Sequence, residues 1–84
     1  MFGYFVYVLK STKTRHYYVG QTSNPKKRLV EHNLGRVYWT KRYKPWVIIY
    51  SEGFKTREEA AKKEKYFKSH AGRTWLKRNL VPVA

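Results

Sequence analysis

One carboxylate stands where a helical pattern would otherwise place apolar side chains. Glu64 follows Ala60 by four residues and precedes Phe67 by three, so a helix would put all three side chains on one face. A carboxylate on an apolar face is costly unless it pairs with a cation or binds a metal ion. Two interpretations are open: a salt bridge to Lys63, Lys68 or a neighbouring strand, or a ligand for a divalent cation.

Four further residues have side chains suited to phosphate chemistry. Arg28 and His32 are four apart and share a helix face. Arginine can grip a phosphate through two parallel hydrogen bonds, and histidine titrates near neutral pH. Tyr7 and Tyr18 fall in neighbouring expected strands, and a phenol acts as a base only when cations or a metal lower its pKa. The plainer alternatives are a solvated helix flank and ordinary strand tyrosines.

The charge of the chain favours a polyanionic partner. Nineteen Lys and Arg against five acidic residues give a formal net charge of +14, and such a field attracts nucleic acid over long range. A membrane surface is disfavoured, because the basic residues are spread along the chain and form no basic helix with a continuous apolar face. The candidate nucleic-acid-binding residues are Lys26, Lys27, Tyr38, Lys41, Arg42, Lys65 and Lys68. Tyr38 and Trp39 either stack on bases or anchor their loop to the domain.

The acidic residues limit the kind of metal site. All five are glutamates, whereas a two-metal nuclease clusters several carboxylates around its ions. One metal held by one carboxylate is feasible. The chain contains no cysteine, which excludes disulfides and thiolate metal sites and gives no sign of secretion. We therefore expect a cytoplasmic protein.

Periodicity and capping residues predict the elements. Strands are expected over Tyr4–Leu9 and His16–Gly20, paired as a hairpin. A helix is expected over Pro25–Leu34, with Asn24 as its cap and Gly35 as its stop.

The second half repeats this alternation of strand and helix. After a basic loop over Arg36–Lys44, the expected elements are a strand over Trp46–Ser51, a helix from the cap Thr56 to about Ser69, an interruption at Gly72, a short helix over Thr74–Leu80 and an end at Pro82. The order β-β-α-β-α-α predicts a single α+β domain over 1–84, with helices flanking a three-stranded antiparallel sheet. Asn79, four residues after Trp75, is expected on the buried side of the last helix.

The order and spacing of these residues resemble the GIY-YIG nuclease family from Tyr4 to about Leu80. Phe5-Val6-Tyr7 and Tyr18-Val19-Gly20 correspond to its two signature strands, with Phe5 and Val19 replacing the usual Gly and Ile. Arg28 matches the catalytic arginine and Glu64 the metal-binding glutamate. His32 completes an Arg-x-x-x-His pattern, and Thr40, Pro45-Trp46 and the lysines around Glu64 resemble small stand-alone bacterial members.

The resemblance implies a DNA endonuclease that uses one Mg²⁺ or Mn²⁺ ion and is structure-selective or weakly selective. It implies that Glu64 is the only protein ligand of the metal and that Arg28 neutralises phosphate charge. It also implies that Tyr7 accepts a proton from water and passes it on through His32 or solvent. Tyr18 would position water or phosphate, with Gly20 and Asn79 in support. DNA is favoured over RNA. The alternatives are a non-catalytic nucleic-acid-binding module and a nuclease that needs a partner protein for substrate specificity.

Overall fold

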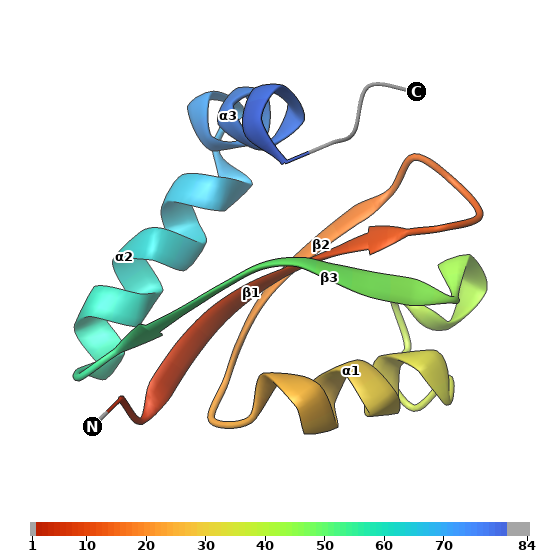
Figure 1. Ribbon diagram of the computed structural model, residues 1–84, viewed down its shortest axis with the longest axis horizontal. Helices are drawn as coiled ribbons and strands as arrows, with labels where there is room; N and C mark the ends of the chain where they lie inside the picture. Colours follow the sequence, from red (N-terminus) through yellow and green to blue (C-terminus); the bar gives the residue numbers. More distant parts are fainter. Residues whose placement is uncertain (1, 81–84) are drawn as a thin grey trace.

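A three-stranded antiparallel sheet lies at the centre of the computed structural model, which describes residues 2–80 (Figure 1). The elements in order are β1 (Tyr4–Ser11), β2 (Tyr17–Thr22), α1 (Pro25–Asn33), the 3₁₀ turn η1 (Lys41–Tyr43), β3 (Trp46–Phe54), α2 (Arg57–Lys68) and α3 (His70–Asn79). The strand order is β2-β1-β3, and both pairs are antiparallel. The predicted α+β class and the order β-β-α-β-α-α are confirmed.

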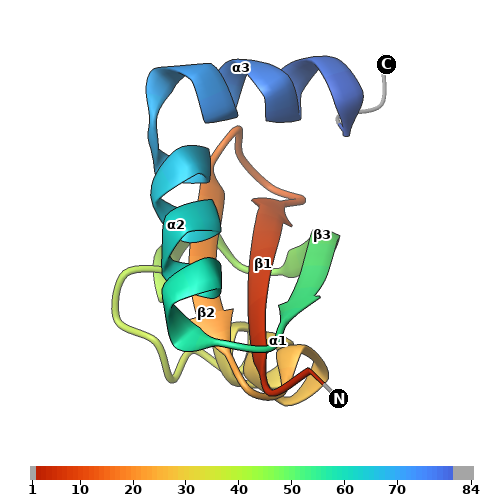
Figure 2. The same cartoon turned by 90° about the vertical axis from the view of Figure 1, so that its left-hand side faces the viewer.

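The central strand β1 supplies a core to each face of the sheet. Val6 and Val8 alternate toward one face, where they pack with buried residues of the helices α2 and α3. Tyr7 and Leu9 alternate toward the other face, where they pack with Trp46 and the side chains around α1. Figures 1 and 2 show α2 and α3 on one side of the strands and α1 below the other. Helix α2 thus packs on β1 and β2 from one face, while α1 packs on β3 and β1 from the other.

The predicted starts of α1 and α2 are present as hydrogen-bonded caps. The Asn24 side chain accepts a hydrogen bond from the Lys27 N–H at 3.1 Å, with Pro25 at the first position of α1. The Thr56 hydroxyl accepts one from the Glu59 N–H at 3.2 Å. Gly35 has φ +78°, the left-handed conformation expected of a helix stop. These local contacts fix the bounds of the first two helices.

The predicted interruption at Gly72 is wrong. The chain breaks at Ser69 instead, whose side chain caps α3 by accepting a hydrogen bond from the Gly72 N–H at 3.2 Å. Gly72 lies inside α3, where a Cβ would come within 2.6 Å of the Phe67 Cα and would clash with the Tyr66 backbone. The glycine permits close packing of α3 on the end of α2. The third strand also runs to Phe54, beyond the predicted end at Ser51.

The predicted burial of Asn79 is wrong as well. The buried residues of α3 are Gly72 and Leu76. Asn79 is exposed, and its side-chain amide donates to the Trp75 carbonyl of its own helix at 2.8 Å. The expectation took Trp75 as a buried reference, but that side chain is itself 38% exposed. The predicted end at Pro82 lies outside the described residues.

Candidate active site

The Tyr7 side chain fits into its buried position because the residue that faces it is a glycine. It lies on β1 directly across from Gly20 of β2, and only 1% of its surface is exposed. A Cβ at position 20 would lie 2.5 Å from the Tyr7 hydroxyl oxygen and 2.7 Å from the ring carbon that carries it. Gly20 therefore leaves room for the phenol, which gives physical content to the supporting role that the family resemblance implies for it.

A chain of hydrogen bonds leads from Tyr7 to a buried threonine. The Tyr7 hydroxyl lies 2.9 Å from His32 Nε2, and His32 Nδ1 lies 2.7 Å from the Thr40 hydroxyl. That hydroxyl donates its proton to the Val37 carbonyl at 3.3 Å, so it accepts from Nδ1–H of the imidazole. The remaining ring nitrogen, Nε2, then accepts the Tyr7 proton. Both His32 and Thr40 are buried, so the pair is held in this tautomer.

Burial sets the protonation states along this chain. Burial first, and then the neighbouring Arg28 cation, lower the pKa of His32 to about 4 against a smaller opposing effect of Glu31, so the imidazole is neutral near pH 7. Burial also raises the pKa of Tyr7 to about 12; the Arg28 guanidinium beside it acts the other way, while Tyr18 and Glu64 raise it. Tyr7 is thus a neutral phenol whose oxygen keeps lone pairs available while its proton is donated to His32.

Tyr18 and Arg28 complete the cluster on this face. The Tyr18 ring centre lies 6.2 Å from that of Tyr7 and 4.8 Å from that of His32. Arg28 projects from α1 and forms a half-exposed ion pair with Glu31 at 3.1 Å. Arg28 also faces a small polar hollow of about 270 Å³ where β2 leads into α1. Its other lining residues are Gln21, Thr22, Ser23, Asn24, Lys27 and Glu31. A phosphate group placed there would meet a guanidinium held by its own helix.

Glu64 lies on the face of the sheet opposite Tyr7, beside the edge strand β2. Its carboxylate accepts hydrogen bonds from Lys68 at 2.8 Å and from the Gln21 side chain on β2 at 3.3 Å. The plainer interpretation of Glu64, a salt bridge, is therefore present with Lys68. Lys63 pairs instead with Glu52 at 3.8 Å. Since Glu64 contributes to the pKa of Tyr7, its charge also acts on the cluster across the edge strand.

The number of liganding side chains near Glu64 limits the kind of metal ion that this carboxylate can hold. Within residues 2–80, no three or more His, Asp or Glu side chains gather closely enough to hold an ion together. The Glu64 side chain is about one quarter exposed, and one of its oxygens accepts from Gln21 while the other accepts from Lys68. A single carboxylate of this kind suits an ion that retains most of its waters, as Mg²⁺ does. The residues present fit sparse ligation of one ion and do not fit a two-metal site.

Two features of the site were not predicted from the sequence. One is the residue Gln21, and the other is the hydrogen bond between Thr40 and His32. Gln21 could have been found from strand alternation, because the neighbour of Gly20 on an edge strand points to the face where α2 packs. The contact between Thr40 and His32 depends on how a long loop folds back, and nothing in its local sequence signals it.

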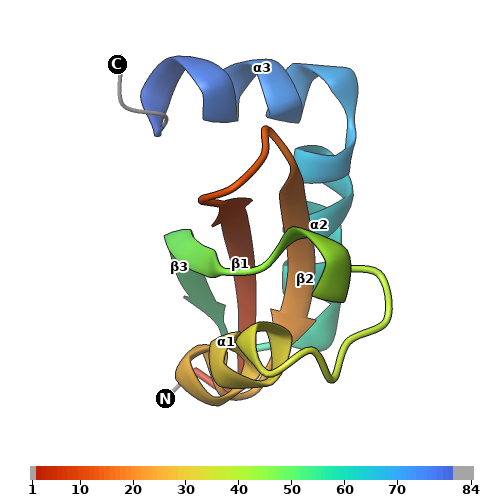
Figure 3. The ribbon, with the colours of Figure 1, turned by 90° about the vertical axis from the view of Figure 1, so that its right-hand side faces the viewer.

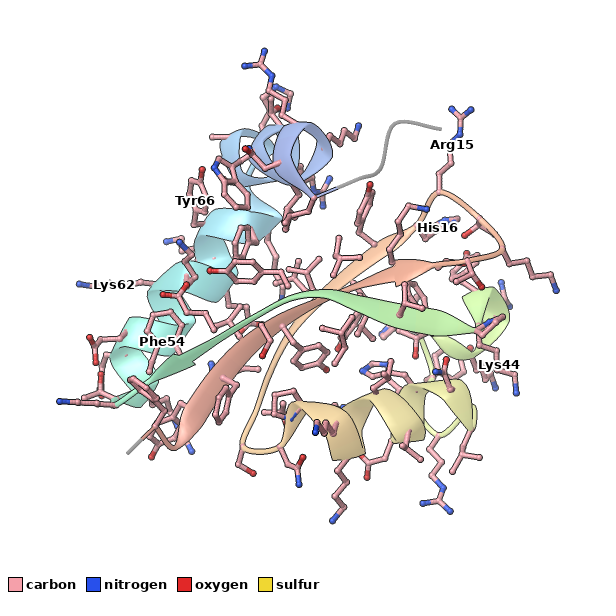
Figure 4. All side chains as sticks on the ribbon, viewed as in Figure 1. Arg15, His16, Lys44, Phe54, Lys62 and Tyr66 are labelled. Atoms are coloured by element: carbon pink, nitrogen blue, oxygen red, sulfur yellow. The ribbon has the colours of Figure 1, made fainter. Side chains whose placement is uncertain are left out.

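The candidate nucleic-acid-binding residues are all exposed but belong to two surfaces. Lys26, Lys27, Tyr38, Lys41 and Arg42 follow α1 and its loop, whereas Lys65 and Lys68 lie on α2. Lys68 also lines a larger cleft of about 1190 Å³ between α3 and the β1–β2 hairpin. Cationic side chains project all round the molecule in Figure 4, where Lys62 and Lys44 mark opposite ends.

A family model described as the GIY-YIG catalytic domain matches residues 3–79. The chain therefore belongs to the GIY-YIG family, and the resemblance drawn from its signature strands is confirmed.

The similarity extends to small bacterial proteins of the UPF0213 family. A UPF0213 protein of Listeria innocua is 44% identical over 66 residues, which cover 77% of this chain and 72% of that protein. The UPF0213 protein YazA of Bacillus subtilis is 39% identical over 66 residues, 77% of this chain and 66% of YazA. A UPF0213 protein of Bacillus halodurans, solved by NMR, superposes with a TM-score of 0.55 at 24% identity, covering 94% of this chain and 87% of that one. That structural likeness supports the fold alone.

None of the helices described between residues 2 and 80 is long and apolar enough to cross a membrane.

Proposed function

We propose that this protein is a metal-dependent DNA endonuclease that hydrolyses phosphodiester bonds. The observation that carries the proposal is the buried chain from Tyr7 through His32 to Thr40, with Arg28 beside it. His32 is a buried imidazole whose Nδ1 donates to Thr40 and whose Nε2 accepts from a phenol, so Nε2 is placed to take the phenolic proton. As a proton acceptor in phosphate chemistry, the pair has a clear use.

The proton path follows from the tautomer. Tyr7 accepts a proton on its oxygen from the attacking water and gives its own proton to Nε2 of His32. The neutral imidazole can accept it, because Thr40 already takes the hydrogen bond from Nδ1. This concerted transfer avoids a free phenolate, which the raised pKa of Tyr7 makes costly. Tyr18 positions the water or the phosphate beside both rings.

Negative charge on the phosphate would be met by Arg28 and by the metal ion that Glu64 would hold. Arg28 lines the polar hollow and neutralises negative charge that builds on the phosphoryl oxygens. Glu64 would hold one Mg²⁺ or Mn²⁺, with Gln21 orienting its carboxylate. When bound, the ion supplies Lewis-acid stabilisation of the leaving oxygen. Lys68, which now pairs with Glu64, would turn toward the DNA backbone.

The experiment is cleavage of end-labelled duplex, single-stranded and branched DNA at low salt with Mg²⁺, Mn²⁺ or EDTA. Glu64→Ala is compared with Glu58→Ala, which removes an exposed carboxylate from the first turn of the same helix. The proposal predicts metal-dependent cutting that Glu64→Ala lowers at least about 100-fold and Glu58→Ala leaves unchanged. Binding with no cutting under any metal would instead favour a nucleic-acid-binding module or a nuclease that needs a partner protein.

A further inference from the structure

Two aromatic side chains next to the candidate site are turned outward. Trp39 is 77% exposed and Tyr38 is 67% exposed, more than any other large hydrophobic residue described. Their ring centres lie 5.6 Å apart and their planes are nearly perpendicular, at 86°. The alternative that both rings anchor the loop to the domain is therefore wrong. Figure 3 shows the connection between α1 and η1 standing out from the body of the molecule beside β2.

The backbone beneath the two rings is firmly held. The Val37 carbonyl accepts hydrogen bonds from the Thr40 N–H at 3.2 Å and the Lys41 N–H at 3.1 Å. The Thr40 carbonyl accepts from the buried Trp46 indole at 2.9 Å. Thr40 itself is 1% exposed and bonded to His32. The aromatic pair is thus presented by a fixed turn, since its neighbours on both sides are bonded into the fold.

The chemistry around the rings selects a polyanion with accessible bases. Exposed Arg36, Lys41 and Arg42 flank the pair, and the Lys41 ammonium lies 4.8 Å from the Tyr38 ring centre. Exposed rings among cations form a surface on which bases stack while the cations meet the phosphates. Bases inside a duplex are already stacked on each other, so only unpaired bases offer a free face.

We infer that Tyr38 and Trp39 stack on unpaired bases of the DNA, so that the substrate carries unpaired nucleotides beside the bond that is cut. This rests on the proposed nuclease function and narrows its substrate to single strands, flaps, forks and bulges. The position of the pair supports it. Trp39 directly precedes Thr40, which is bonded to His32, so a base stacked on the pair fixes the strand with respect to the Tyr7–His32 hydrogen bond.

Binding in EDTA separates this inference from catalysis. Oligonucleotides carrying 2-aminopurine, as a single strand, a flap and a fully paired duplex, report stacking through quenching and affinity through anisotropy. Trp39→Ala is expected to weaken binding of the single strand and flap at least about 5-fold and to remove the quenching. Duplex affinity should stay within twofold, and Trp39→Phe should restore most of the loss.

Tyr66→Ala is the matched control. Its ring is also partly exposed, at 38%, and also lies under a lysine, with the Lys63 ammonium 5.6 Å from the ring centre. Figure 4 places Tyr66 at the α2–α3 end, away from Lys44, which follows η1. This variant should bind every DNA as the wild type does.

Two results of the binding experiment would overturn the inference. One is unchanged affinity and quenching in Trp39→Ala; the other is an equal loss for paired and unpaired DNA. The first would leave the exposed pair for a different occupant, such as a protein. A wild type that binds unpaired DNA with quenching but never cuts it would overturn the nuclease proposal and leave the stacking surface intact. Normal cutting of unpaired DNA by Trp39→Ala would overturn the stacking inference and leave the nuclease proposal intact.

Discussion

At the scale of single residues, the candidate site depends on a histidine kept neutral by the fold. His32 is completely buried, with one ring nitrogen on Tyr7 and the other on Thr40. Its lowered pKa is due first to burial and then to Arg28. A proton taken up from solvent would put an Nε2–H where the Tyr7 hydroxyl now donates, so Tyr7 would have to turn its own proton away and accept instead.

The stability of the protein should therefore depend on pH through His32. The folded pKa is about 4 and the unfolded pKa is near 6.5, so between these values the unfolded chain binds a proton that the folded chain does not. The free energy of unfolding should fall as the pH drops from 6.5 to 4, by up to about 3 kcal/mol, and this loss should level off below 4. Urea titrations across this range measure it.

The comparison variant is His32→Gln, which keeps a polar side chain but cannot titrate. Subtracting its pH profile removes the contribution of the glutamates. If the wild type and the variant show parallel profiles, the neutral buried imidazole is the wrong account of this residue.

At the scale of elements, one asparagine joins the end of α1 to the start of β3. The Asn33 side chain donates to the Trp46 carbonyl at 3.0 Å and accepts from the Trp46 N–H at 2.6 Å. These two bonds close the loop that carries Thr40. They make α1 and β3 a single unit around the buried side of the candidate site.

Asn33→Ala should therefore destabilise the fold by about 1–3 kcal/mol, because it leaves two backbone groups of Trp46 without partners. Chemical denaturation followed by tryptophan fluorescence checks this. Lys26→Ala, at an exposed position of the same helix, serves as control and should change stability by less than about 0.5 kcal/mol. Equal midpoints for the two variants would contradict the bridging role.

The elements also show where sequence reasoning succeeds. The starts of α1 and α2 were predictable because Asn24 and Thr56 cap their helices through contacts three residues away. The start of α3 was missed because Gly72 was interpreted as a local break in the helix. The glycine is instead required by tertiary packing, because α3 lies close against the end of α2 at this position.

The site follows the same division between local and tertiary contacts. The shared helix of Arg28 and His32 was predictable from their spacing. The bond between Tyr7 and His32 joins residues 25 apart, and the outward direction of Tyr38 and Trp39 depends on the burial of Thr40. Neither has a local signal.

At the scale of the whole molecule, the charge of +14 acts on any nucleic acid that approaches. Binding should weaken steeply with salt, with a slope of about −3 or steeper in log K against log salt concentration for duplex DNA. Lys27, which lines the hollow beside Arg28, should contribute to that slope. Lys27→Ala should therefore reduce it by about 1, as measured by anisotropy titrations at several salt concentrations.

The control for this prediction is Lys62→Ala. Lys62 is exposed on α2 and points away from the sheet in Figure 4. Its removal should leave the slope nearly unchanged. An equal reduction in both variants would indicate that the charge attracts DNA without orienting it toward the hollow.

The most direct test of the proposed active site is the single-turnover rate of DNA cleavage by Arg28→Ala, measured with Mg²⁺ at saturating protein on a substrate that the wild type cuts. Arg78→Ala, which removes an exposed cation from α3, serves as control. We expect a rate at least about 100-fold below wild type for Arg28→Ala and a near-normal rate for Arg78→Ala. Cleavage by Arg28→Ala at the wild-type rate would contradict the assignment of this cluster as the catalytic centre.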